Sequence, residues 1–182
     1  MSTRKERYVE KGSKKFRYIV TTAYGKELQG ELELGDALLP YDFNLKISYT
    51  PFKGVLVLDT SIEFKELMRI LLEHPPSTIR RIVKVDVCCS IDQNLTKCVE
   101  SYLLKVRGKY HKVLFGRKGS LKHELLKIVE LVALKYRSSE KVLNVLHIEP
   151  IDHEVCLGLM GLGEDKFHVL RDKKIREILS NT

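Results

Sequence analysis

The stretch RRIVKVDVC, residues 80–88, decides how the first half of the chain folds. Apolar residues stand at every second position from Val83 to Val87, and the polar residues Lys84 and Asp86 alternate with them. Successive side chains of a strand project to opposite faces of its sheet, so this alternation predicts a strand with one face buried.

The segments before this stretch supply the partners that such a strand needs. We predict a strand at 16–23, a helix at 26–39 with Leu28, Leu32 and Leu39 near one face, a hairpin of strands at 44–49 and 54–60, and a helix at 62–74 that ends at Pro75-Pro76. The order β-α-β-β-α-β is that of ferredoxin-like folds. We therefore predict a ferredoxin-like domain over 16–89, preceded by a basic tail, residues 1–15, that we expect to be disordered.

A second unit follows without a flexible linker and is predicted to span residues 90–182. Its pattern predicts a helix at 95–103, a strand at 110–116, a helix at 121–136, strands at 141–149 and 153–160, and a closing helix at 171–179. The expected fold class is α+β, with an N-terminal ferredoxin-like βαββαβ unit packed rigidly on a C-terminal mixed α/β unit.

Charge and hydropathy limit the classes of protein to consider. The formal net charge is +8, which fits either a polyanionic partner or merely a soluble basic protein. No apolar run approaches the roughly 18 residues that cross a bilayer, and no signal region follows the basic N-terminus. We expect a cytoplasmic protein that does not contact membranes.

The cysteines give no sign of a metal site. The four cysteines, at positions 88, 89, 98 and 156, form no CxxC pair, and no histidine cluster has ligand spacing. We therefore expect no metal, and we expect all four cysteines to be reduced structural residues.

No catalytic motif is present. The sequence contains no P-loop, no GxSxG elbow and no HExxH, and the glycines of GLMGLGED (158–165) follow the order GxxGxG instead of GxGxxG. Asp152, His153 and Glu154 are consecutive, so as strand residues they would not converge on one side. We expect no catalytic residue and no cofactor.

Positive charge is concentrated in KVRGKYHKVLFGRKGSLKH, residues 105–123, which holds seven lysines and arginines and no acid. Arg117 and Lys118 lie between a predicted strand end and a helix N-terminus, where backbone N–H groups favour a phosphate. The candidate RNA-binding residues are Lys105, Arg107, Lys109, Lys112, Arg117, Lys118 and Lys122, together with Arg80 and Arg81 after the Pro-Pro turn and Tyr110 as a stacking ring. The alternative is that these charges are only solvated surface groups.

Several segments resemble a known family, the THUMP domains. FKGVLVLDTS (52–61) and the segment 64–89 resemble the region leading into a THUMP domain, although Lys84 stands where the family usually has proline. HKVLFGRKGSLKHELLKIVELV (111–132) resembles the basic strand, loop and helix of that domain. VLNVLHIEPIDHEVCLGLM (142–160) resembles its closing strands, with Glu149 at the family's glutamate. The resemblance covers about residues 16–175.

The resemblance implies a tRNA-binding module behind a ferredoxin-like domain, one that grips the acceptor end of tRNA. It also implies a stand-alone protein, because the chain has no room for a catalytic domain after the THUMP-like unit. Such proteins include the adaptor of an acetyltransferase that makes N4-acetylcytidine in tRNA. Arg117 and Lys118 match the family's basic loop.

We therefore expect a non-catalytic protein that presents tRNA to a separate modification enzyme. Two alternatives stay open: a protein-interaction module whose basic face meets an acidic partner, and an unrecognised RNA-modifying enzyme. DNA binding is less favoured, because no recognition-helix arrangement is evident.

Overall fold

The computed structural model describes residues 15–116 and 123–180. Within these ranges the elements are β1 (Phe16–Thr22), α1 (Glu27–Leu38), β2 (Lys46–Tyr49), β3 (Val55–Thr60), α2 (Phe64–Glu73), β4 (Ile79–Val85), β5 (Val87–Ser90), α3 (Leu95–Lys105), β6 (Lys112–Phe115), α4 (His123–Lys135), β7 (Asn144–Ile151), β8 (Glu154–Gly161) and α5 (Phe167–Ser180). None of these helices is long and apolar enough to span a membrane. The predicted tail, residues 1–15, lies outside the description except for Lys15.

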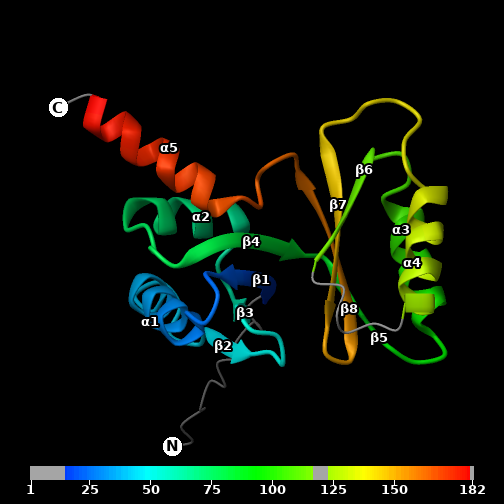
Figure 1. Ribbon diagram of the computed structural model, residues 1–182, viewed down its shortest axis with the longest axis horizontal. Coiled ribbons are helices and arrows are strands. Elements are labelled where there is room, and N and C mark those ends of the chain that lie inside the picture. Colours follow the sequence, from blue (N-terminus) through cyan, green and yellow to red (C-terminus); the bar gives the residue numbers. More distant parts are fainter. Residues whose placement is uncertain (1–14, 117–122, 181–182) are drawn as a thin grey trace, which may run out of the picture.

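The first unit is the predicted ferredoxin-like one. Its four antiparallel strands have the order β2-β3-β1-β4, and α1 and α2 pack on one face of this sheet (Figure 1). Fully buried side chains from the strands, such as Tyr18 and Leu58, meet Leu34 of α1 and Leu71 of α2 in one core. The predicted β-α-β-β-α-β order is confirmed.

The predicted apolar face of α1 is wrong. Leu28 and Leu32 of the helix and Leu39 directly after it are exposed to 65%, 54% and 44%. The helix instead buries Gly30, Leu34 and Leu38. A methyl group on Gly30 would lie 2.6 Å from Cγ2 of Thr22 on β1, so the glycine lets the helix approach the sheet closely.

The second unit is a mixed sheet with two helices on one face. The strand order is β5-β8-β7-β6, and β6 and β7 are parallel, whereas the other neighbours are antiparallel. α3 and α4 cover one face of this sheet (Figure 1), where Val99 and Val129 join Leu146 and Leu157 in a second core. The predicted α+β class, with a ferredoxin-like unit followed by a mixed unit, is confirmed.

The stretch 80–88 is not one strand, which corrects the expectation. β4 ends at Val85 in the first sheet, and β5 begins at Val87 in the second. Asp86 stands at the crossing and holds the second unit: its Oδ2 accepts hydrogen bonds from the Tyr102 hydroxyl at 2.7 Å and from the Leu159 N–H at 2.9 Å. The alternation continues through Asp86, so it carries no sign of the change of sheet.

The two sheets meet through the face of the second sheet that α3 and α4 leave uncovered. Ile19 and Val83 of the first sheet pack there against Ile151 and Met160 of the second. α5 then returns to the first unit, where Phe167 is fully buried in the core beside α2 (Figure 1). The division of the chain at residue 89 stays a prediction.

We had expected all four cysteines to be reduced, and this is wrong: they form two disulfides. Cys88 pairs with Cys156, and Cys89 pairs with Cys98. The first bridge joins residues that face each other across β5 and β8. Cys89 projects from β5 to the opposite face, where Cys98 of α3 packs against the core. Both pairings depend on tertiary neighbours, which spacing along the chain does not reveal.

Candidate nucleic-acid interface

Four of the predicted basic residues form an exposed run between α3 and β6. Lys105 ends α3, Arg107 and Lys109 lie in the turn, and Lys112 begins β6, and all four are exposed. Gly108 makes the turn with a positive φ of 71°, and its N–H donates to the Tyr136 carbonyl at 3.0 Å. We call these four residues the basic edge.

The four cations of the basic edge form no ion pair with any residue that the structure describes. The surface lysine Lys135, by contrast, lies 3.6 Å from the Glu100 carboxylate. Exposed cations that no carboxylate of the described ranges neutralises are available to phosphates, and arginine adds a planar fork that can hold two phosphate oxygens.

β6 is the edge strand of the second sheet, and its side chains divide between the two faces. Val113 and Phe115 pack toward the core under α3 and α4. Lys112 and Leu114 therefore lie on the other, uncovered face, at the register of Val145 and His147.

The remaining basic residues of this region, Arg117, Lys118 and Lys122, lie outside the described residues. Their flanks are described: Gly116 follows β6 and donates its N–H to the Ile148 carbonyl at 2.8 Å, and α4 begins at His123. The flanking elements are thus a strand end and a helix N-terminus, as we predicted from the sequence, and the structure adds that the strand pairs in parallel with β7.

Glu149 lies over the point where this segment leaves the sheet. A methyl group on Gly116 would fall 1.7 Å from Oε2 of Glu149, so only glycine leaves room for that carboxylate. The Glu149 side chain is buried, and Oε1 receives a hydrogen bond of 3.2 Å from Nη2 of Arg81. Burial raises the pKa of Glu149, and the neighbouring Arg81 opposes that shift.

Arg81 belongs to a buried polar group and is not a free phosphate ligand, which corrects its predicted role. Its Nε lies 2.8 Å from Oδ2 of Asp165, and its Nη2 lies 3.4 Å from Nδ1 of His147. We call Arg81, His147, Glu149 and Asp165 the junction cluster, because it joins β4 to β7 and to the start of α5. The neighbouring Arg80 is exposed and remains a candidate contact.

Tyr110 cannot stack on a base from its position, so that prediction is wrong. Its side chain is fully buried in the core of the second unit, and its hydroxyl donates to the Ala133 carbonyl at 2.5 Å. Burial raises the pKa of Tyr110 to about 12. The ring fixes the turn of the basic edge against α4 and takes no part in the surface.

Sequence reasoning missed most of the junction cluster. His147 is 0% exposed, and its Nε2 has no hydrogen-bond partner among the described residues. Burial lowers the pKa of His147, and the nearby Arg81 charge lowers it further, against the opposing effect of Asp165. Asp165 lies in a turn far along the chain. Glu149 had been singled out only through the resemblance, and Arg81 had been given a different role, as a phosphate ligand.

The sequence matches no protein-family profile and no curated protein. Among solved structures, TrmN from Thermus thermophilus is similar with a TM-score of 0.53 at 13% identity, over 83% of this chain and 47% of that one. PH1313 from Pyrococcus horikoshii Ot3 has a TM-score of 0.49 at 11% identity, over 81% and 55%. A 4-thiouridine synthetase, in a complex with RNA and ATP, has a TM-score of 0.46 at 17% identity, over 82% and 42%.

This chain thus spans about half of the length of these structures or less. The likeness to TrmN is one of fold, over most of this chain.

Proposed function

We propose that this chain is a non-catalytic tRNA-binding protein that presents tRNA to a separate modification enzyme. The observation that carries the proposal is the basic edge, four exposed cations without ion-pair partners among the described residues. The family resemblance supports tRNA as the partner. It also supports an acetyltransferase that makes N4-acetylcytidine as the enzyme that receives the tRNA.

Binding would consist mainly of contacts to phosphates. The exposed Lys112 of β6 and the turn cations Arg107 and Lys109 would follow one backbone. Arg117 and Lys118, which come next in the sequence, would extend the contact. Phosphate contacts set the position of the RNA without reading its sequence, so selectivity would come from the shape of tRNA and its unpaired 3′ end. The chemistry would belong to the partner enzyme.

Equilibrium binding of a labelled tRNA transcript across a salt series tests this proposal. The wild type is compared with a variant in which the basic edge is neutralised, Lys105→Ala/Arg107→Ala/Lys109→Ala/Lys112→Ala. The matched control is Lys173→Ala/Lys174→Ala, which removes two exposed lysines of α5. Duplex DNA and a 3′-trimmed tRNA serve as competitors.

The proposal expects tight binding that weakens with salt, a loss in the basic-edge variant, near-normal binding in the control, and weak competition by DNA and by trimmed tRNA. Equal loss in both variants, or equal binding to every polyanion, would overturn it. Arg117→Ala/Lys118→Ala is the corresponding test of the loop.

The two alternatives make different predictions. A protein-interaction module would form a protein complex that survives nuclease treatment and would bind tRNA weakly in the salt series. An RNA-modifying enzyme would leave altered nucleosides in tRNA that is incubated with the purified chain alone, which nucleoside analysis detects. The adaptor would raise N4-acetylcytidine formation only when the acetyltransferase is also present.

A further inference from the structure

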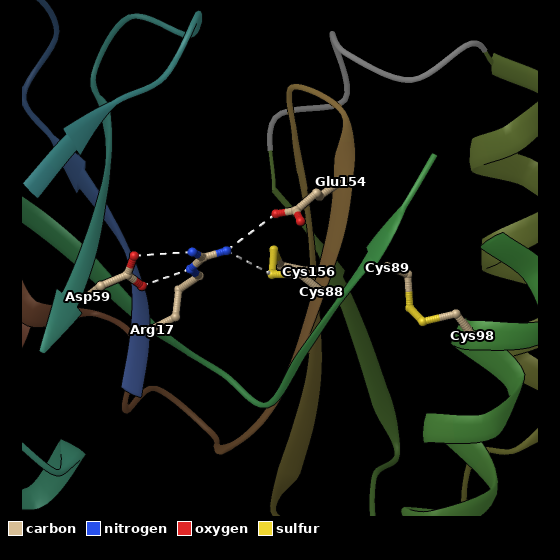
Figure 2. Close-up of a disulfide and its surroundings, with 7 residues drawn as sticks. All are labelled: Arg17, Asp59, Cys88, Cys89, Cys98, Glu154 and Cys156. Atoms are coloured by element: carbon tan, nitrogen blue, oxygen red, sulfur yellow. Dashed lines mark hydrogen bonds and ion pairs between the residues drawn. A yellow bond between two sulfur atoms is a disulfide. The ribbon is translucent and has the colours of Figure 1, made fainter. Parts of the chain in front are cut away.

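Arg17 links the two units beside a disulfide (Figure 2). From β1 it makes a double hydrogen bond to Asp59 of β3, with Nε and Nη2 at 2.8 and 3.1 Å from the two carboxylate oxygens. Its Nη1 reaches across to the second unit, 3.3 Å from Oε2 of Glu154 and 4.0 Å from Sγ of Cys88. The guanidinium thus places Glu154 next to the Cys88–Cys156 bridge.

Three side chains that can ligate a metal converge at this point. Cys88 of β5 faces Cys156 of β8 directly across the sheet. Glu154 precedes Cys156 by two residues, so its side chain emerges on the same face of β8. The two sulfur atoms and a carboxylate oxygen all lie within 4.8 Å of one another.

We propose that Cys88, Cys156 and Glu154 bind one zinc ion when the disulfide is reduced. Two equivalents of a thiol reductant such as glutathione would convert the bridge to two thiols and would leave as a disulfide. Zinc would then bind both sulfurs and release their two protons to solvent. The disulfide and the metal site exclude each other, because the same sulfur atoms form both.

The chemistry of the ligands and the charge balance favour zinc. Zinc binds thiolate sulfur and carboxylate oxygen at four-coordinate sites, and a site with three protein ligands keeps its fourth position for water. Two thiolates and the Glu154 carboxylate carry three negative charges, of which the zinc ion neutralises two. Arg17, which is shared with Asp59, holds Glu154 in place and lies against the charge that the metal leaves over.

The site has an approach from solvent. Glu154 has a side chain that is 42% exposed, and it lines a cleft of about 570 Å³ between the β7–β8 turn and the β2–β3 hairpin. Tyr49 and Thr50 form the hairpin side of this cleft, and His153 lies on the turn side. The cleft gives an ion access to the Glu154 side of the site.

The second disulfide provides a matched comparison within the same chain. Cys89 is buried to 1% exposure, and Cys98 packs against the same hydrophobic core of the second unit. Among the described residues, only Cys88, Glu154 and Cys156 form a group of three or more suitable ligands. Reduced Cys89 and Cys98 would therefore lack a third ligand and would bind zinc poorly.

The test is an anaerobic titration of the reduced protein with Co²⁺. Bound Co²⁺ reports thiolate ligation by its charge-transfer and d–d absorption. Zn²⁺ is then added to displace it. The proposal expects one ion per chain in the reduced wild type and none in the oxidised protein. Cys98→Ser should bind as the wild type does, and Cys88→Ser should lose the charge-transfer band. Glu154→Gln, at a partly exposed position, should fold normally and weaken binding about tenfold or more.

Absence of cobalt bands in the reduced wild type would overturn the proposal. Retention of the bands in Cys88→Ser, or their loss in Cys98→Ser with the fold intact by circular dichroism, would overturn it as well. The outcome is separate from tRNA binding, because none of the three ligands belongs to the basic edge.

Discussion

Gly158 of β8 lies directly against the backbone of Lys84 of β4: a methyl group on Gly158 would fall 1.8 Å from the Lys84 carbonyl oxygen. At Gly158 a strand of the second sheet therefore lies directly against the backbone of a strand of the first. The junction of the two units therefore requires glycine at position 158.

Gly158→Ala should destabilise the protein by about 1–3 kcal/mol or more, because the backbones must separate to admit the methyl group. Chemical denaturation measures the change in the free energy of unfolding. Gly35→Ala is the matched control, since a methyl group there meets only Cδ1 of Leu39 at 3.9 Å. It should stabilise α1 by about 0.5–1 kcal/mol, and a similar loss in both variants would contradict the packing explanation.

Arg81→Met should lower the free energy of unfolding by about 3 kcal/mol, because it leaves the buried carboxylates of Glu149 and Asp165 without a cation. The expected loss is at the low end for buried pairs, since 27% of the Arg81 side chain is exposed. Arg80→Met, at the exposed neighbouring position, should change the free energy of unfolding by less than about 0.5 kcal/mol. Denaturant unfolding of both variants measures the difference.

Adding Glu149→Gln and Asp165→Asn to Arg81→Met should recover part of the loss, because neutral side chains replace the unpaired charges. A triple variant as unstable as the sum of its single changes would count against an electrostatic origin.

His147 should make stability depend on pH. Its pKa in the folded protein is below the usual 6.5, chiefly through burial, so the unfolded chain binds the proton more readily. The stabilising contribution is full above pH 6.5 and is lost as the pH falls toward the folded-state pKa, at no more than about 1.4 kcal/mol per pH unit.

Unfolding measured from neutral to mildly acidic pH in the wild type and in His147→Gln checks this, and the variant should show a shallower decline. His153→Gln is the control, because that side chain is 92% exposed. A decline of equal slope in wild type and His147→Gln would assign the pH dependence to other groups.

Single changes in the basic edge should alter the salt dependence of tRNA binding by a defined amount. Each phosphate contact contributes about 0.7–0.9 to the slope of log K against log salt. Lys109→Ala and Lys112→Ala should therefore each reduce that slope by close to one, whereas Lys173→Ala should leave it unchanged. Unaltered slopes in all three variants would show that the basic edge does not contact phosphates.

The fold was largely predictable because its signals are local. The strand at 54–60 and the helix at 62–74 were predicted from residues a few positions apart, and β3 and α2 formed within two residues of those bounds. The failure at Asp86 has the opposite cause. A strand that changes sheets keeps its alternation, and only the distant donors Tyr102 and Leu159 mark the crossing.

The charge of the candidate interface was predictable from the sequence, but the exposure of its individual residues was predictable only in part. The basic edge is exposed as a cluster of lysines and arginines should be, because such side chains are rarely buried without partners. Tyr110 and Arg81 have the same local surroundings in sequence as their exposed neighbours. Tyr110 is buried because α4 packs over its ring. Arg81 is withdrawn from the surface because it forms ion pairs with Glu149 and Asp165.

By itself, the sequence determined the order of strands and helices, the α+β class and the concentration of positive charge between α3 and α4, since each depends on residue type and short-range spacing. Only the tertiary structure decided which distant residues meet. Arg81 and Glu149 are 68 positions apart, as are Cys88 and Cys156. The first contact exists because the two sheets pack together, and the second because β5 pairs with β8 within one sheet. The resulting burial, charge pairing and ligand geometry have no counterpart in the spacing of residues along the chain.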